Sequence, residues 1–313
     1  MFRLIIFIIT LLLVVIVNAE SPDNLSLGTP GNADTVVNRK GYALGYSEKY
    51  EQPLWVIYRI TKEEMNSPRF RRTDDFRPDP AIKTGSAALG DYRRSGYDRG
   101  HLAPAATMGF SRQAMSESFY LSNMSPQKPQ FNRAIWKKLE SQVRTWAHQN
   151  KDIYVITGPV IKPGYKTIGR NSVAVPQYYY KVIFDISPPS FKMIAFILEN
   201  KGSKQPLKTF VVTVDDVEKL TGLDFFSEFP DIIEDKLESQ SDINQWDEET
   251  SINSSQKNDL TLPSKYVASK RSKVFHHVKC VHAKKIAAYN KVGFKEKSTA
   301  VDTGRRPCKR CNP

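Results

Sequence analysis

The stretch "DIYVITGPV" (residues 152–160) is dominated by β-branched and aromatic residues, which favour an extended strand. Three other runs have the same character: "PLWVIYRIT" (53–61), "QYYYKVIFDI" (177–186) and "FKMIAFILEN" (191–200). Strands therefore outnumber long helices, and the sequence has no regular alternation of strand and helix. This pattern predicts an α+β fold with a central antiparallel sheet flanked by helices.

The clearest helix covers "NRAIWKKLESQVRTWAHQ" (132–149). Its apolar residues recur at helical spacing: Ile135, Leu139, Val143 and Trp146. The stretch "FVVTVDDVEKLTGL" (210–223) predicts a strand followed by a helix with Thr213 or Asp215 as N-cap. Before the long helix, "SESFYLSNMSPQ" (116–127) predicts a short strand and then a Pro-marked loop.

The N-terminus differs from the rest of the chain. Arg3 precedes an apolar run from Leu4 to Val17, and small residues follow it, which predicts a signal peptide over residues 1–19. We therefore expect an exported protein, secreted or periplasmic, with no stable membrane association after cleavage. A retained anchor is the alternative. An organellar location is disfavoured, because the segment lacks the Arg-rich amphipathic pattern of a transit peptide.

Composition divides the remaining 294 residues of the 313-residue chain. Residues 20–45 are rich in Gly, Pro and Asn and predict an N-terminal arm, and the main domain is expected over 46–238. Residues 239–262 are acidic and poor in apolar side chains, as a linker is. Residues 263–313 recover aromatic and β-branched positions around the cysteines and predict a small separate module.

The chain is basic, with a formal net charge of +13. Residues 263–313 hold 14 Lys and Arg against two acidic residues. Such a balance indicates a polyanionic partner, with DNA or RNA the first candidate, although a solvated basic surface fits it equally well. All three cysteines lie in the last 34 residues, so the main domain has no disulfide framework.

The stretch "SGYDRGHLAPAA" (95–106) carries the residue types that phosphodiester hydrolysis needs. His101 suits a general base, since an unperturbed imidazole titrates near neutral pH. Asp98 could orient the imidazole or hold a metal-bound water, and Arg99 could contact phosphate. By itself, however, "DRGH" is also compatible with an ordinary hairpin turn.

The helix at 132–149 offers a second group of polar side chains. Asn132, Trp136, Glu140 and Arg144 follow one another at i, i+4 spacing along it. The Asn132 side-chain oxygen suits a hard cation such as Mg²⁺, Glu140 could hold its waters, and Arg144 could face a phosphate. The alternatives are an N-cap at Asn132 and an ordinary Glu140–Arg144 ion pair.

Several motifs together resemble the DNA/RNA non-specific endonuclease family, the ββα-metal nucleases with a DRGH motif. They are "DYRRSGYDRGHLAPAA" (91–106), "YLSNMSPQ" (120–127), "FNRAIWKKLE" (131–140), "YVITGPV" (154–160), "VPQYYYKVIFD" (175–185), "AFILEN" (195–200) and "VDDVEKLTGLDFF" (214–226). The resemblance covers roughly residues 50–238 in unbroken order. It implies a ββα-metal motif within the α+β fold.

The resemblance also implies a role for each matching residue. His101 would be the general base and Asn132 the direct protein ligand of Mg²⁺. Glu140 and Asp98 would orient metal-bound waters and the histidine. The further residues implied for the site are Arg99, Asn123 as a support, Arg144 as a phosphate contact, and an upstream arginine, best matched by Arg72, with Arg71 and Arg69 as alternatives.

The function that follows is an Mg²⁺-dependent endonuclease hydrolysing DNA and RNA to 5′-phosphate products with little sequence preference. The alternative is a catalytically inactive nucleic-acid-binding or DNA-uptake protein. The complete set of site residues disfavours that alternative, since a decayed site should have lost members.

The C-terminal cysteines form a candidate zinc set. His276 precedes Cys280 by four positions, and Cys308 and Cys311 form a CxxC pair. Structural zinc takes four such S or N ligands. The segment 266–313 resembles the small metal-binding module of Ada-type DNA repair proteins, which uses four cysteines. A histidine replaces the first one here, and His277 and His282 remain alternatives to His276. A Cys308–Cys311 redox pair is the competing interpretation.

Overall fold

The computed structural model describes residues 24–150, 152–187, 191–229, 231–247, 265–287, 290–294 and 296–313. The predicted signal peptide (1–19) and most of the predicted linker (248–262) lie outside these residues. Within them, no helix is long and apolar enough to cross a membrane.

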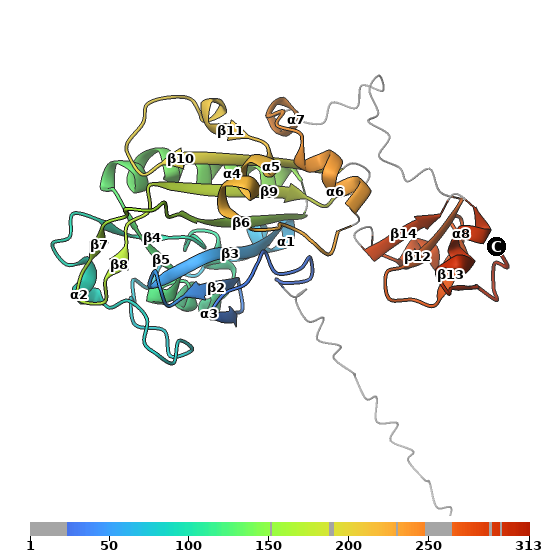
Figure 1. The fold of residues 1–313 in the computed structure, drawn as a ribbon, viewed down its shortest axis with the longest axis horizontal. Coiled ribbons are helices and arrows are strands. Elements are labelled where there is room, and N and C mark those ends of the chain that lie inside the picture. Colours follow the sequence, from blue (N-terminus) through green and yellow to red (C-terminus); the bar gives the residue numbers. More distant parts are fainter. Residues whose placement is uncertain are drawn as a thin grey trace, which may run out of the picture.

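A seven-stranded sheet forms the centre of the main domain, and all its neighbouring strands are antiparallel. Its order is β1 (Thr35–Asn38), β2 (Ala43–Ser47), β3 (Gln52–Thr61), β6 (Asp152–Val160), β9 (Tyr178–Asp185), β10 (Lys192–Glu199) and β11 (Val211–Val212). Figure 1 shows the long strands lying side by side with helices on both faces. The predicted fold class and its principal strands are thus confirmed.

Successive residues of each strand enter different cores, because the side-chain period of a strand is two. On β3, Val56, Tyr58 and Ile60 pack with α4 (Lys137–Gln149), whereas Trp55 and Ile57 face the opposite side. On that side, α5 (Val214–Thr221) and α6 (Asp231–Glu238) cover the sheet. We call these the α4 face and the α5–α6 face.

The long helix begins differently from the prediction. Its first turn, Phe131–Trp136, is a π-helix, and the α-helix proper starts at Lys137. The wider turn breaks the i, i+4 stripe predicted from Asn132 through Trp136. Trp136 is fully buried and stacks on Phe131 at 5.2 Å between ring centroids, while Asn132 stays half-exposed.

A strand pair on the α4 face leads into this helix. The tetrapeptide "DRGH" is not a turn but strand β4 (Asp98–His101), which pairs antiparallel with β5 (Met124–Gln127). The predicted strand-then-loop order over 116–127 is therefore reversed: a 3₁₀ turn at Leu121–Asn123 comes first and the strand follows. Together β4, β5 and α4 make the ββα arrangement implied by the resemblance.

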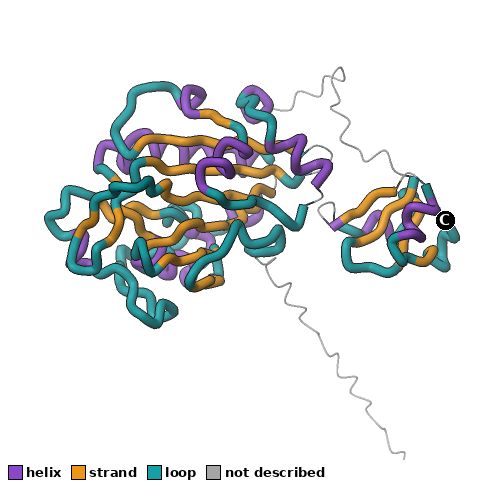
Figure 2. The backbone as a smooth tube through the Cα atoms, in the orientation of Figure 1, coloured by secondary structure: helices purple, strands orange, loops and turns teal. Residues whose placement is uncertain are grey.

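Shorter elements connect these parts of the main domain. They are α1 (Lys62–Asn66), α2 (Leu89–Tyr92), α3 (Arg112–Glu117), β7 (Thr167–Ile168), β8 (Val173–Ala174), α7 (Asn244–Asp247) and the 3₁₀ turns Met108–Phe110 and Leu207–Phe210. Figure 2 shows how much of the chain between the strands is loop.

The predicted boundaries of the main domain need correction at both ends. Residues 35–45 of the predicted arm form β1 and part of β2, because backbone pairing with β3 extends the sheet. At the other end, α7 lies within the predicted linker, yet Trp246 is buried with its ring centroid 5.1 Å from that of Trp146. Ile243 packs on the same core, and Lys192 Nζ donates to Gln245 O at 2.9 Å, so this acidic segment contacts the main domain through several residues.

The C-terminal module forms a separate four-stranded sheet, which agrees with the predicted small domain. Its order is β14 (Lys291–Phe294), β12 (Tyr266–Ser269), β13 (Val274–His277) and β15 (Arg306–Pro307). A 3₁₀ turn at Ala283–Lys285 and α8 (Lys297–Asp302) complete it. Its apolar clusters are small, and two of its cysteines, Cys280 and Cys308, are among the buried members.

Candidate active site

His101 ends strand β4 and lies between two aromatic rings. Its imidazole makes edge contacts with Phe119 at 4.8 Å and Phe76 at 5.6 Å between centroids. The Nε2 atom is enclosed and has no hydrogen-bond partner among the described residues. Buried polar atoms are normally paired, so an enclosed nitrogen without a partner marks a position where a ligand or water fits.

The surroundings of His101 keep its imidazole neutral. Burial lowers the pKa of His101, and the positive charges of Arg72 and Arg99 lower it further, to about 3. A neutral imidazole has a lone pair available and can accept a proton. The site therefore holds its histidine in the protonation state that a base requires.

Asp98 contacts residues of the π-turn and not the imidazole. Its carboxylate accepts hydrogen bonds from Asn132 Nδ2 at 2.9 Å and from Arg133 Nε and Nη2 at 2.8 and 2.6 Å. Partial burial raises its pKa, but these hydrogen bonds give a net lowering. The expectation that Asp98 orients His101 is not met, because side chains three positions apart on a strand point to opposite faces.

Glu140 lies in α4 at the centre of a group of cations. Burial raises the pKa of Glu140, while the charges of Lys181, Arg144, Arg72 and Lys137 act in the opposite direction. Lys181 is fully buried on β9 below it, and burial lowers the Lys181 pKa to about 8. The two buried charges therefore stabilise one another.

Arginines surround the same space. Arg144 Nη2 donates to Ser141 Oγ at 2.9 Å, while its Nη1 is enclosed and without a partner in the described part of the chain. The Arg72 guanidinium lies 4.7 Å from the centroid of Phe119, the ring that also contacts His101. Arg99 lies 4.1 Å from the centroid of Phe76.

The structure distinguishes between the three upstream arginines. Arg69 is held by backbone carbonyls, with Nη2 donating to Thr107 O at 3.1 Å and to Ala106 O. Arg72 instead acts electrostatically on both His101 and Glu140. Arg71 is exposed to solvent. Arg72 thus acts on His101 and Glu140, whereas Arg69 lies close enough for its charge to interact with that of Arg144.

Asn123 and Gly100 fix the backbone around His101. Asn123 Oδ1 accepts from Ala103 N at 2.9 Å, and its Nδ2 donates to Ala103 O and Ser118 O at 3.0 and 2.8 Å. A Cβ on Gly100 would come within 2.1 Å of the Gln127 side chain, so only glycine lets β4 approach β5 this closely.

Two charged residues at the site were missed by the sequence reasoning. Arg133 makes the bidentate ion pair with Asp98, and Lys181 lies under Glu140. Lys181 Nζ donates to Tyr58 Oη at 3.4 Å and lies 4.7 Å from the Trp136 ring centroid. A lone lysine inside the apolar run "YYYKVIFD" was the available signal, because a buried strand rarely holds an unpaired charge.

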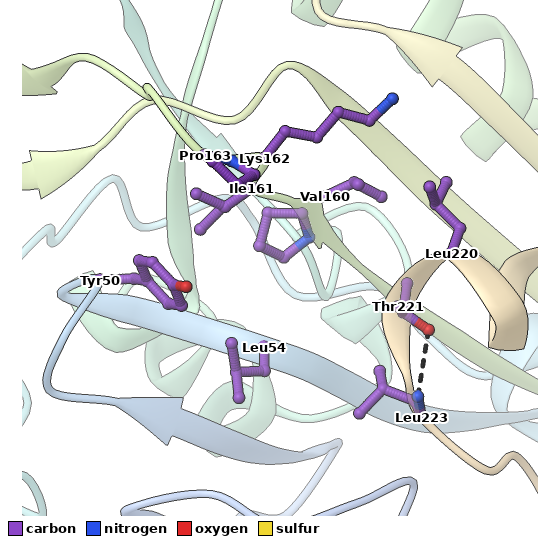
Figure 3. Close-up of a pocket in the computed structure, with 10 residues that line it drawn as sticks. Tyr50, Leu54, Val160, Ile161, Lys162, Pro163, Leu220, Thr221 and Leu223 are labelled. Atoms are coloured by element: carbon purple, nitrogen blue, oxygen red, sulfur yellow. Dashed lines mark hydrogen bonds between the residues drawn. The ribbon is translucent and has the colours of Figure 1, made fainter.

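A pocket of about 240 Å³ lies elsewhere in the main domain (Figure 3). Leu54, Val160, Leu220 and Leu223 line it, and no histidine or carboxylate is among its lining residues. Leu54, Val160 and Leu223 belong to the core of the α5–α6 face. This pocket therefore cannot supply the acid–base groups that surround His101 on the α4 face.

The C-terminal module brings together four side chains that could hold a metal ion. The ligand atoms of His276, Cys280, Cys308 and Cys311 all lie within 4.8 Å of one another. His276 Nδ1 and Cys280 Sγ are 3.7 Å apart, and all three cysteines are free thiols. Of the alternatives, His277 uses its Nδ1 to accept from Lys279 N at 3.2 Å.

Known proteins share the main domain. Human mitochondrial endonuclease G is 35% identical over 212 residues, which is 63% of this chain and 71% of the relative. Mouse mitochondrial nuclease EXOG is 37% identical over 202 residues, 59% of this chain and 55% of the relative. A chain in the crystal structure of the EndoG/EndoGI complex has a TM-score of 0.61 at 34% identity, covering 66% of this chain and 91% of that one.

These relatives correct the predicted location. Export to the periplasm or medium is wrong, since human endonuclease G, mouse EXOG and the related nucleases of two yeasts are mitochondrial. The prediction of export rested on the hydrophobicity of the N-terminal apolar run. Hydrophobicity shows that a segment favours leaving water, but it does not specify the membrane or compartment.

The match to the family as a whole covers more than half of the chain. A model of the DNA/RNA non-specific endonuclease family matches residues 20–232, a range that starts before β1 and ends within α6. It contains the β4–β5–α4 motif and every residue described around His101. The chain therefore belongs to the DNA/RNA non-specific endonuclease family and is an endonuclease.

Proposed function

We propose that this endonuclease hydrolyses phosphodiester bonds of DNA and RNA with Mg²⁺, that His101 is its general base, and that it leaves 5′-phosphate ends. The observation that carries the proposal is a pair of enclosed nitrogens that have no hydrogen-bond partner among the residues the structure describes, His101 Nε2 and Arg144 Nη1, in one site with Glu140. A base and an unpaired guanidinium are the groups that a water molecule and an anionic phosphate would engage.

His101 supports the chemistry as a proton acceptor. Its low pKa keeps Nε2 unprotonated at neutral pH. A bound phosphate brings negative charge beside the imidazole and raises its proton affinity, because an opposite charge favours the protonated form. The neutral histidine would then take the proton of the water that attacks phosphorus.

The oxygen atoms near His101 fit a hard cation. Asn132 donates through Nδ2 to Asp98, which orients the amide and leaves Oδ1 available as an oxygen ligand. Glu140 would hold waters of the ion. Mg²⁺ prefers oxygen ligands and keeps several waters, and when bound it supplies charge stabilisation at the phosphoryl oxygens. Asp98 acts in this scheme by holding Asn132, not by contacting the base.

Positive side chains would position the nucleic acid through its backbone. Arg144, Arg72 and Arg99 surround His101 and Glu140, and each can contact a phosphate. Phosphate contacts carry no sequence information, so we expect weak sequence preference and cleavage of both DNA and RNA.

The test compares His101→Ala with His148→Ala, a matched change at an exposed histidine of α4. We expect His101→Ala to lose at least about 10²-fold of plasmid and RNA cleavage, as loss of a general base does, while circular dichroism stays unchanged. His148→Ala should keep full activity. Activity of His101→Ala within tenfold of wild type contradicts the assignment. The ends are tested separately: if the 5′ ends of the products can be labelled with phosphate without prior phosphatase treatment, the products do not carry 5′-phosphates.

We propose, second, that His276, Cys280, Cys308 and Cys311 bind zinc. In a zinc tetrahedron with bonds of about 2.3 Å to sulfur and 2.05 Å to nitrogen, an S···N edge measures about 3.6 Å. The 3.7 Å between Cys280 Sγ and His276 Nδ1 fits this edge. The ion would hold together a module whose apolar core is small, and the module would present its many lysines and arginines to phosphates.

Metal analysis of the full chain tests the zinc proposal. We expect one zinc per chain, lost in Cys308→Ser and retained in the control His277→Ala. Loss of the metal should weaken DNA binding at low salt, with a smaller dependence on salt, because fewer phosphates are neutralised. A zinc-free protein whose module resists proteolysis equally well would overturn this proposal.

A further inference from the structure

Three carboxylates meet on the α5–α6 face, away from His101. Asp215 and Glu218 belong to α5, and Glu238 is the last residue of α6. The ligand oxygens of the three all lie within 4.8 Å of one another. Val214, Val217 and Leu237 anchor both helices in the core of this face, so the cluster and the nuclease site are on opposite sides of the sheet.

Glu238 is the unusual member of the cluster. Only 6% of the residue is exposed, and its Oε1 atom is enclosed with no hydrogen-bond partner in the described part of the chain. A buried carboxylate without a cation or donor is strongly disfavoured, because desolvation removes its hydration and nothing replaces it. The side chain reaches its neighbours at the C-terminal end of α6, where the helix dipole also favours positive charge.

The charges around Glu238 add electrostatic repulsion to the desolvation of its carboxylate. The groups that act on it are Glu218, Glu234, Asp215 and Asp224, all of them acidic. Burial and this repulsion together disfavour the charged form of Glu238 when no cation is nearby. Glu218 is held in place as well, since its Oε1 accepts from Phe225 N at 2.6 Å. The fold thus keeps the carboxylates together against their repulsion.

We propose that Asp215, Glu218 and Glu238 bind a calcium ion that joins α5 to α6. All the donors are oxygens, which excludes the softer metals that thiolates and imidazoles select. Calcium bonds of about 2.3–2.6 Å let oxygens on opposite sides of the ion lie up to about 5 Å apart. Mg²⁺ demands shorter bonds and a near-ideal octahedron, so a mixed set of three side chains on two helices suits calcium better.

The ion would have a structural effect that is distinct from catalysis. It would link the end of α6 to the start of α5, where the two helices already pack on the same core. Binding to the folded state alone raises stability with ligand concentration. It would also explain how an acidic segment folds back on the domain.

Calorimetric titration of the full chain with CaCl₂ tests the proposal. The background variant Asn132→Ala removes the ligand proposed for the nuclease site, so that calcium bound there does not contribute. We expect one calcium per chain, and binding at least about tenfold weaker in Glu238→Gln and in Asp215→Asn. Asp235→Asn, an exposed acid on the same helix, is the matched control and should bind as before.

A thermal melt gives a readout independent of activity. Calcium should raise the Tm of the background variant and of the Asp235→Asn control, but not that of Glu238→Gln. Without calcium, the isosteric Glu238→Gln should melt no lower than its parent, since it removes buried repulsion. The proposal is overturned if calcium gives neither heat nor a Tm shift, if Glu238→Gln binds it equally well, or if Mg²⁺ binds more tightly. If calcium gives neither heat nor a Tm shift, a proton shared between the carboxylates would have to relieve their repulsion instead.

Discussion

The two faces of the seven-stranded sheet receive different kinds of side chain from the same strands. On β9, Tyr180, Val182 and Phe184 enter the α5–α6 core, where Phe184 lies 4.9 Å from both Phe226 and Phe229 between centroids. The alternate residue Lys181 points to the α4 face, below Glu140. On this strand the α5–α6 side carries apolar side chains into the core, whereas the α4 side includes a buried lysine.

This difference separates what holds the fold from what performs the reaction. Apolar burial stabilises a protein without directional requirements, whereas a buried charge needs a partner at a fixed position. On the α4 face the charge of Lys181 acts on Glu140, and Asp98 forms an ion pair with Arg133. Mutations on the two faces should affect different measurements.

The largest expected effect is on stability, from the α5–α6 face. Phe184→Ala should lower the free energy of unfolding by about 3–5 kcal/mol, because it leaves a cavity between aromatic rings. Urea denaturation measures this change. Cleavage per folded molecule, assayed at low temperature, should stay near wild type. If cleavage per folded molecule also fell clearly below wild type, the two faces would not be independent.

The next effect is on pH dependence, from the α4 face. The charge of Lys181 lowers the pKa of Glu140, so Lys181→Met should raise that pKa and protonate Glu140 at higher pH. If the carboxylate is the active form, activity will fall as pH decreases, and this acid limb should move to higher pH in the variant. A pH–rate profile measures the shift.

Lys192→Met is the control for this prediction. Lys192 is a largely buried lysine on β10, also on the α4 face, but its Nζ pairs with Asp185 at 3.8 Å and donates to Gln245 O at 2.9 Å. Its removal should leave the acid limb unchanged. Equal profiles for both variants would assign Lys181 a role in packing alone.

The smallest expected effect comes from the N-cap of α5. Thr213 Oγ1 accepts from Asp216 N at 3.0 Å, and Asp216 Oδ2 accepts from Thr213 N at 3.2 Å. Thr213→Ala should cost about 1 kcal/mol of unfolding free energy, as loss of a cap usually does. Activity should not change, because this helix covers the face opposite His101. A drop in cleavage at 25 °C would contradict that separation.

Local patterns predicted much of the architecture. The strands at 53–61, 152–160 and 177–186 match β3, β6 and β9 to within a residue or so. Of the two N-cap candidates for α5, Thr213 and Asp215, the structure has Thr213 at the cap. The short strands β1 and β2 were missed, since their stability comes from pairing with β3 and not from composition. The π-turn at Phe131–Trp136 was missed for a similar reason, because its pattern of apolar residues fits an α-helix.

The candidate site, too, was predicted only in part from the sequence. Motif spacing brought out His101, Asn132 and Glu140, which the structure places in one ββα unit. Spacing could not show that Asp98 turns away from the imidazole, because that depends on which face of β4 each side chain takes. Nor could it show Arg133 as the partner of Asp98, since an ion pair forms only once β4 lies beside the π-turn.

Local periodicity and motif spacing were sufficient to predict the long strands, the long helix, the family and the residue types of the candidate site. Which charged side chains lie close together became clear only from the folded structure. Lys181 and Glu140 are 41 positions apart, and Asp215 and Glu238 are 23 apart. The electrostatic energy of each pair depends on the distance between the charges and on their burial, and both are set only when the chain has folded.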